Sequence, residues 1–187
     1  MSMREETFLA GLGGQGVLLA GQLLARAGMN HGLKVSWYPM YSPEVRGGST
    51  TCTVVFADGR VGSPISGRPS SMLLMDAIAF ETFAGRVAVG GLLVLNSSMI
   101  EQPVARDDCE VVMVPAGEIA VELGNERTVN MIMIGAYVAK TGILTVEAVA
   151  EALREMLPER HHKHMPANIA ALERGAEIGS GSKQAGG

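Results

Sequence analysis

A cluster of glycines near the amino terminus, in the stretch FLAGLGGQGVLLAG, is the segment best suited to hold an anionic ligand. It fits the spacing GxGxxG, between an apolar strand-like run and a helix-like run. In such a unit the glycines permit a tight turn and a close approach of a pyrophosphate, while the helix amino terminus directs free N–H groups at the anion. Similar turns also occur where a helix only packs on a sheet. The residues of this predicted binding turn are Gly11, Gly13, Gly14, Gln15 and Gly16.

The residues that would hold the ribose of a dinucleotide are missing. An NAD site normally has an acidic residue at the end of the second strand. No Asp or Glu occurs between Glu6 and Glu44, and the second predicted strand ends in WYP. The nearest basic residue beyond that strand, Arg46, lies well into the following loop, so NADP is disfavoured too. A stand-alone NAD(P)- or flavin-dependent oxidoreductase therefore remains only an alternative hypothesis, which binding of these cofactors to the purified protein would test.

Polar residues follow two further predicted strands, in the stretches YSPEVRGGST and NSS. The carboxyl ends of parallel strands meet at one edge of a sheet, which is where open α/β folds bind ligands. We therefore expect these residues to approach the glycine turn and to line a cleft with it. The additional candidate binding residues are Ser42, Glu44, Arg46, Gly47, Gly48, Asn96 and Ser97.

The sequence offers no metal site. Cys52 and Cys109 are far apart and belong to no CxxC pair, whereas a structural zinc or an iron–sulfur cluster needs several ligands at fixed spacing. The stretch HHKH is flanked by prolines and predicts a solvated linker rather than a ligand set. Its histidines are His161, His162 and His164.

Composition places the chain among ordinary folded proteins. Its 187 residues are 47% hydrophobic and 18% charged, and the net charge of −4 gives no basic footprint for nucleic acid. The amino terminus MSMREETF lacks a signal-peptide apolar region, and no run approaches the roughly 20 apolar residues that span a bilayer. We therefore expect a cytoplasmic protein that makes no contact with nucleic acid or membranes.

Alternating strand and helix patterns predict an α/β domain with a mostly parallel sheet, one antiparallel hairpin and helices on both faces. The hairpin is expected at Asp58-Gly59, a strong turn signal between two strand-like runs. Residues 1–178 are expected to form one domain and 179–187 a disordered tail. The predicted strands are 7–11, 33–40, 49–57, 60–65, 70–76, 92–98 and 109–116, with Pro39 ending the second. The predicted helices are 15–30, 77–87, 116–123, 126–141, 145–156 and 166–177.

One predicted helix, VNMIMIGAYVA, is apolar nearly all round. Such a helix is either buried in the core or covered by a partner. Burial in the core is the favoured interpretation, because most apolar helix faces of this kind lie inside the domain.

Five stretches together resemble the gamma subunit of 2-oxoacid:ferredoxin (acceptor) oxidoreductases. They are GLGGQGVLLAGQLLA, YSPEVRGGSTTCTVVF, GSPI, GGLLVLNSSMI and NMIMIGA, and they occur in order from about residue 8 to residue 140. The combination of GxGGQG with PEVRGG is specific, while either motif alone would not be. The PEVRGG block is similar to that of the 2-oxoglutarate and branched-chain 2-oxoacid members.

The resemblance implies a Rossmann-like domain within a complex that contains thiamine diphosphate, Mg, iron–sulfur clusters and coenzyme A. Such a complex decarboxylates a 2-oxoacid, reduces ferredoxin and forms an acyl-CoA, with 2-oxoglutarate the expected substrate. The implied partners are alpha and beta subunits, with a delta subunit in some members, and ferredoxin through the complex. This chain would supply structure and part of the coenzyme A cleft, with no catalytic residue or cofactor of its own.

The residues agree with a non-catalytic role. The chain has no cluster cysteines and no Gly-Asp-Gly with a downstream Asn that could hold the magnesium and pyrophosphate of thiamine diphosphate. If faces meant for partners are exposed, the isolated chain is expected to form a homodimer. A nucleotide-sensing or purely structural homo-oligomer is the third hypothesis, which stable self-association without larger partners would favour.

Overall fold

The computed structural model describes residues 3–41, 49–61 and 67–181. Its centre is a six-stranded sheet with the strand order β2-β3-β1-β4-β5-β6. The pairs β1–β4, β4–β5 and β5–β6 are parallel, whereas β3 is antiparallel to both β1 and β2. The strands are β1 Arg4–Leu12, β2 Lys34–Tyr41, β3 Ser49–Ala57, β4 Ser71–Leu74, β5 Leu92–Asn96 and β6 Glu110–Val114.

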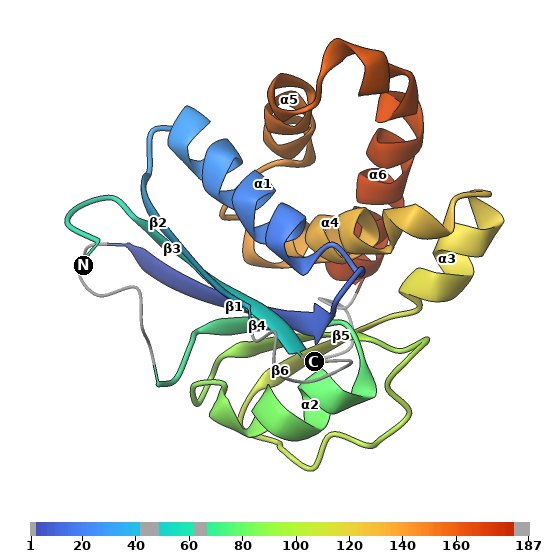
Figure 1. Cartoon of the computed structure of the whole chain (residues 1–187). Coiled ribbons are helices and arrows are strands. Elements are labelled where there is room, and N and C mark those ends of the chain that lie inside the picture. The colour runs from blue at the N-terminus through green and yellow to red at the C-terminus, as the bar shows by residue number, and fades with distance from the viewer. Residues whose placement is uncertain (1–2, 42–48, 62–66, 182–187) are drawn as a thin grey trace.

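Helices cover both faces of this sheet, as predicted (Figure 1). Successive strand residues point to opposite faces. Leu9 and Leu73 therefore pack into the core shared with α1, α4, α5 and α6, while Phe8 and Met72 pack into a second core beneath α2. The helices are α1 Val17–Asn30, α2 Ala77–Phe83, α3 Ala116–Glu122, α4 Val129–Thr141, α5 Val146–Met156 and α6 Met165–Gly181.

The predicted hairpin at Asp58-Gly59 is wrong. Both edges of β3 are occupied, since Thr53 pairs with Phe8 of β1 on one side and with Tyr38 of β2 on the other. A strand has only two hydrogen-bonding edges, so β3 has no free edge for a hairpin partner after Asp58-Gly59. The Asp58 carboxylate instead accepts a hydrogen bond from the backbone N–H of Met3, at 2.9 Å. Residues 60–61 are not in a strand, and 62–66 lie outside the described residues.

Pro39 does not end the second strand, which continues to Tyr41. Pro39 pairs with Cys52 inside the ladder. Proline is tolerated there because β2 is the edge strand of the sheet, where one side of the strand needs no ladder partner.

The apolar helix is buried in the core, which confirms the favoured interpretation: all residues from Met131 to Val138 of α4 are buried. α4 packs very closely on α6. A Cβ at Gly175 would lie 1.9 Å from the carbonyl oxygen of Ile132, and one at Gly135 would lie 2.0 Å from that of Leu172. Only glycine allows the two backbones to approach this far.

The last helix runs to Gly181, four residues beyond the predicted end at 177, so 179–181 of the predicted tail are helical. The contact that extends it is tertiary, because Gly179 is buried against the backbone of Ala136 in α4. Residues 182–187 lie outside the described part of the chain.

The histidine stretch connects α5 to α6 without a buried residue, as expected of a solvated linker, but it folds as a 3-10 helix, η3 Glu159–His164. The Nε2 atom of His162 lies 2.9 Å from the carbonyl oxygen of Leu157 and 3.1 Å from that of Arg154. This ring therefore holds the end of α5, a structural use that the sequence pattern does not reveal.

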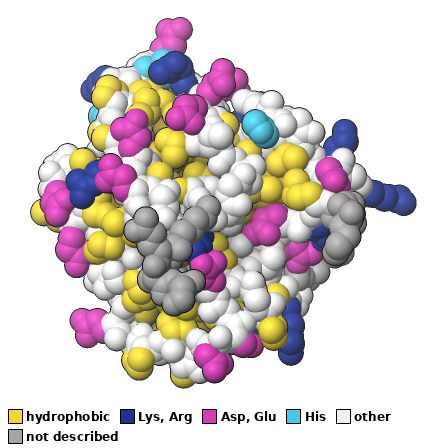
Figure 2. All heavy atoms as spheres, turned by 180° about the vertical axis from the view of Figure 1, so that it is seen from behind, with side chains coloured by type: hydrophobic (Ala, Val, Ile, Leu, Met, Phe, Trp, Pro, Cys, Tyr) yellow, Lys and Arg dark blue, Asp and Glu magenta, His cyan; other side chains and the backbone are white. Residues whose placement is uncertain are grey.

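Within the described ranges, no helix combines the length and apolar character needed to cross a membrane. Figure 2 shows acidic side chains and apolar patches interspersed over one face, with Lys and Arg single or in small groups. That face has no basic stripe of the kind that follows a nucleic-acid backbone.

Candidate functional site

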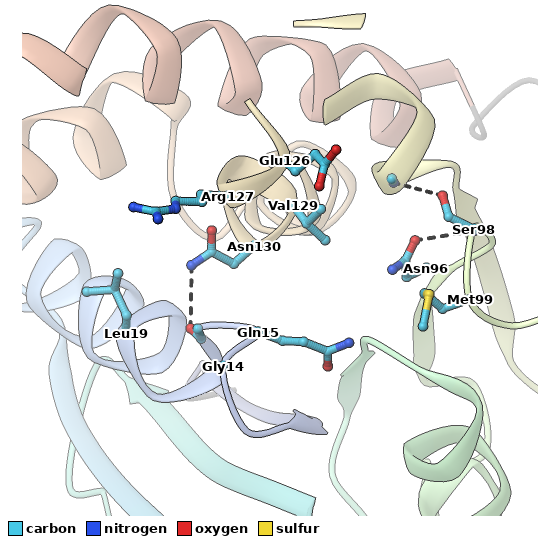
Figure 3. Close-up of a pocket in the computed structure, with 12 residues that line it drawn as sticks. Gly14, Gln15, Leu19, Asn96, Ser98, Met99, Glu126, Arg127, Val129 and Asn130 are labelled. Carbon is cyan, nitrogen blue, oxygen red and sulfur yellow. Dashed lines mark hydrogen bonds between the residues drawn. The ribbon is translucent and has the colours of Figure 1, made fainter. Parts of the chain in front are cut away.

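A pocket of about 580 Å³ opens at the carboxyl edge of the sheet (Figure 3). It is lined by the glycine turn and the start of α1, by the end of β5 and the turn that follows it, by Gly117 of α3, and by residues 126–130, where the 3-10 helix η2 Glu126–Thr128 leads into α4. Its polar side chains are Gln15, Asn96, Ser98, Glu126, Arg127 and Asn130. The predicted meeting of the glycine turn with the end of the 92–98 strand is therefore confirmed.

The glycine turn takes a backbone conformation that suits glycine. Gly14 and Gly16 have φ angles of +95° and +77°, which other residues rarely adopt. Gly16 also faces Asn130, whose Nδ2 would lie 2.5 Å from a Cβ at this position. The first N–H groups of any helix lack an intrahelical acceptor, and at α1 no side chain caps them. These donors and the helix dipole make the pocket favourable for an anionic group.

Gly11 and Gly13, two predicted binding residues, do not line the pocket. Gly11 is buried in β1, where a Cβ would lie 2.4 Å from Oε1 of Gln15 and 2.8 Å from Cβ of Met75. Its role in this structure is therefore close packing rather than contact with a ligand.

Gln15 lines the pocket and also shapes the turn. Its Oε1 accepts a hydrogen bond from the backbone N–H of Leu12, at 2.8 Å. The same N–H donates to the carboxylate of Asp76, also at 2.8 Å, and Asp76 caps α2 through the N–H of Ala79. A buried carboxylate thus lies beside the glycine turn. The sequence analysis did not predict this carboxylate.

Asn96 lines the pocket, but its amide group is engaged within the protein. Nδ2 donates to the carbonyl oxygen of Met75 at 3.0 Å, and Oδ1 accepts from the N–H of Ser98 at 3.3 Å. Ser97, also predicted, does not line the pocket, and its N–H donates to Val114. Both residues shape the end of β5.

Arg127 and Asn130 are among the pocket residues that the sequence did not predict. Arg127 is exposed, and its guanidinium makes no ion pair within the described residues. Asn130 is 5% exposed and places Nδ2 3.5 Å from the carbonyl oxygen of Gly16. The sequence did contain a signal for Asn130, since it is the one polar residue in the apolar run VNMIMIGA. A buried amide needs hydrogen-bond partners, so such a residue indicates a specific contact.

The predicted residues Ser42, Glu44, Arg46, Gly47 and Gly48 lie outside the described residues. The strands on either side reach the same edge as the glycine turn, since Ser49 pairs with Leu12 and Thr50 pairs with both Gly11 and Tyr41. The participation of these five residues in the pocket remains a prediction.

The sheet order gives a second reason against a conventional dinucleotide site. In that fold the second strand lies next to the first, so its terminal carboxylate can reach the ribose. Here β3 separates β1 from β2, and two strand spacings amount to roughly 10 Å.

The two cysteines cannot share a metal ion, because Cys52 packs in the core on one face of the sheet and Cys109 against the core on the other. Burial raises the pKa of the Cys52 thiol to about 12, which keeps it protonated. No group of three His, Cys, Asp or Glu side chains in the described segments could hold a metal ion.

Comparisons with known proteins agree with this architecture. Residues 6–178 match the family model described as pyruvate ferredoxin/flavodoxin oxidoreductase. The chain is 33% identical over 183 residues to the 2-oxoglutarate synthase subunit KorC of Methanothermobacter marburgensis, covering 94% of this chain and 97% of that protein. It is 37% identical over 171 residues to ketoisovalerate oxidoreductase subunit VorA of the same organism, covering 90% of this chain. It spans about a third of the length of the VorA relatives, namely 35%.

A solved structure has the same fold. The gamma subunit of a keto/oxoacid ferredoxin oxidoreductase from Geobacter sulfurreducens superposes with a TM-score of 0.84 at 25% identity, covering 96% of this chain and 98% of that one. The family match over most of the chain supports the resemblance drawn from the GxGGQG and PEVRGG blocks and gives no support to a stand-alone NAD(P) or flavin enzyme. The chain belongs to the pyruvate ferredoxin/flavodoxin oxidoreductase family.

Proposed function

We propose that this chain is the gamma subunit of a 2-oxoacid:ferredoxin oxidoreductase complex whose substrate is 2-oxoglutarate. The observation that carries the proposal is the end-to-end match to KorC, which covers 94% of this chain and 97% of that subunit. The complex would decarboxylate the 2-oxoacid oxidatively, transfer its acyl group to coenzyme A and pass two electrons to ferredoxin. Its partners would be alpha and beta subunits and, in a four-chain complex, a delta subunit, all in the cytoplasm.

Within that complex this chain would have a structural role and would form one side of the coenzyme A cleft. Coenzyme A carries phosphate groups, which suit the uncapped amino terminus of α1 and the Arg127 guanidinium, which forms no ion pair with the described residues. Asn130 would hold the glycine turn in place from beneath. When bound, coenzyme A supplies the thiol that accepts the acyl group.

The other cofactors would lie in the partner chains. Cys52 and Cys109 lie on opposite faces of the sheet and do not fit an iron–sulfur cluster. The decarboxylation and electron transfer would therefore take place on thiamine diphosphate, Mg and clusters held elsewhere in the complex.

Purification of this chain from its own cells tests the proposal. The eluate is assayed for coenzyme A-dependent reduction of a viologen dye with 2-oxoglutarate, pyruvate and branched-chain 2-oxoacids. We expect larger chains containing thiamine diphosphate and iron to co-elute, with the highest kcat/KM for 2-oxoglutarate. A preference for another 2-oxoacid would correct the substrate, while a chain that elutes alone and inactive would overturn the function.

A further inference from the structure

A second depression, of about 700 Å³, lies beside the pocket, between α3 and the turn that follows β5. We call it the α3 groove and define its apolar lining as Met99, Ala120, Val121 and Val129. Met99 is 49% exposed and Val121 is 63% exposed. Contiguous apolar side chains in a concave surface are typical of a protein contact site.

The charged groups that line the α3 groove are all acidic: Glu118, Glu122 and Glu126. Glu122 forms an ion pair with Arg174 at 3.1 Å, whereas Glu118 and Glu126 form none within the described residues. Glu118 accepts a hydrogen bond from the Ser98 hydroxyl, which lowers the pKa of its carboxyl. The rim therefore carries uncompensated negative charge at neutral pH.

The α3 groove is held in shape by its own contacts. The Ser98 hydroxyl accepts a hydrogen bond from the N–H of Gly117 at 2.7 Å, which ties the start of α3 to the turn after β5. A Cβ at Gly117 would lie 2.9 Å from Ser98 Cβ, so the turn and the helix are in direct contact. A surface that is already formed loses little conformational entropy when a partner binds.

We propose that the α3 groove docks a segment of a partner subunit that presents an apolar side chain between Lys or Arg residues. This proposal rests on the proposed function, and it adds the face through which the chain joins its complex. The apolar side chain would fill the space between Met99 and Val121, and the basic residues would face the rim carboxylates. At protein interfaces a buried apolar anchor usually supplies most of the affinity, while the charges around it set the orientation of the partner.

Docking at the α3 groove would also affect the neighbouring pocket. Ser98, Met99 and Val129 line both depressions. A partner segment seated on α3 would therefore form a wall of the pocket at the glycine turn and exclude water from that side.

The test uses the complex purified through a tag on this chain and compares wild type with Val121→Glu, Glu126→Lys and the control Val89→Glu. Val89 is 70% exposed and precedes β5, at the edge of the sheet opposite the pocket. The concentration at which the complex dissociates is measured by dilution in low and high salt. We expect the dissociation concentration to rise at least tenfold for V121E and E126K and to stay within twofold for V89E. We also expect the wild-type complex to dissociate more readily in high salt.

The outcomes separate this proposal from the proposed function. If wild type holds larger chains and both groove variants hold them equally well, the docking site is overturned and the function stands. If wild type holds none, the function itself fails. If V121E leaves the complex intact but converts a dimer of the isolated chain into a monomer, the occupant is a second copy and the proposal is wrong. Circular dichroism checks folding, and E126K decides the matter if V121E is unfolded.

Discussion

The carboxylate of Asp76, two residues after β4, accepts a hydrogen bond from the backbone N–H of Leu12, at the end of β1, with a length of 2.8 Å. The same carboxylate caps α2 by accepting from the N–H of Ala79 at 3.0 Å. Asp76 is 2% exposed, so both contacts lie away from water. One side chain thus links the glycine turn to the helix on the other face of the sheet.

Replacing Asp76 with Ala should lower the free energy of unfolding by about 1–3 kcal/mol. The variant loses a helix cap and one of the two acceptors of the Leu12 N–H, and such losses are of this size. Urea denaturation followed by circular dichroism measures the change. Asp58→Ala, which removes an exposed hydrogen bond to Met3, should cost less than about 1 kcal/mol. Equal effects of the two substitutions would contradict a central role for Asp76.

Replacing Gly175 with Ala should lower the free energy of unfolding by at least about 3 kcal/mol. The new Cβ would lie 1.9 Å from the carbonyl oxygen of Ile132, and this clash would force α6 away from α4. Gly181→Ala is the matched control in the same helix, since no atom of the described residues lies within 4 Å of a Cβ there. Thermal unfolding of both variants should show a large fall in Tm for the first and almost none for the second. A G175A protein as stable as wild type would mean that α4 and α6 are not in backbone contact.

Cys52 should make the protein less stable in alkali. The pKa of its thiol is raised to about 12 in the folded state by burial, while an unfolded cysteine titrates near about 8.5. The unfolded chain therefore loses this proton first, so its contribution to stability is complete below about pH 8.5 and falls as pH rises towards 12. The slope of unfolding free energy against pH, measured between about pH 8 and 10, should be shallower in Cys52→Ala.

The reactivity of the two thiols provides a second readout of the same burial. Cys109 is partly exposed and Cys52 is 1% exposed, so iodoacetamide should modify Cys109 alone in the folded protein. Mass spectrometry of peptides identifies the modified site, and denaturant should expose both. Modification of folded Cys52 at the rate of Cys109 would be inconsistent with its position in the core.

Replacing Arg127 with Ala should raise the KM for coenzyme A about tenfold or more in the intact complex and leave the KM for the 2-oxoacid within twofold. A charged hydrogen bond to phosphate contributes about 1.5–3 kcal/mol. Arg154→Ala, on the exposed side of α5, is the control. An unchanged KM for coenzyme A would remove this chain from the coenzyme A cleft without affecting its membership in the complex.

Local patterns along the chain were enough to predict most elements. The apolar runs of β1, β4 and β5 and the periodicity of α1 and α5 are signals carried by adjacent residues, and they predicted the right element types. The glycine turn was also predictable, because a positive φ at Gly14 and Gly16 is a local backbone requirement. The family resemblance likewise rests on short contiguous blocks.

The errors arose where distant segments compete for the same partner. The signal at Asp58-Gly59 suggested a hairpin, but β1 and β2 occupy both edges of β3. Pro39 is a local strand breaker that an edge position tolerates. The end of α6 depends on Gly179 packing against Ala136, more than 40 residues away in the chain.

By itself, the sequence determined the α/β class, the glycine turn, the absence of the acidic residue that would hold an NAD ribose and the resemblance to a gamma subunit. Each of these features depends on the types and spacing of residues that are neighbours in the sequence. Only the tertiary structure brought Asp76 to Leu12, placed Arg127 and Asn130 at the pocket, and joined Met99 to α3 in a groove. Those relationships depend on which strands pair and which helices pack, and such choices are made by the free energy of the whole fold rather than by any local segment.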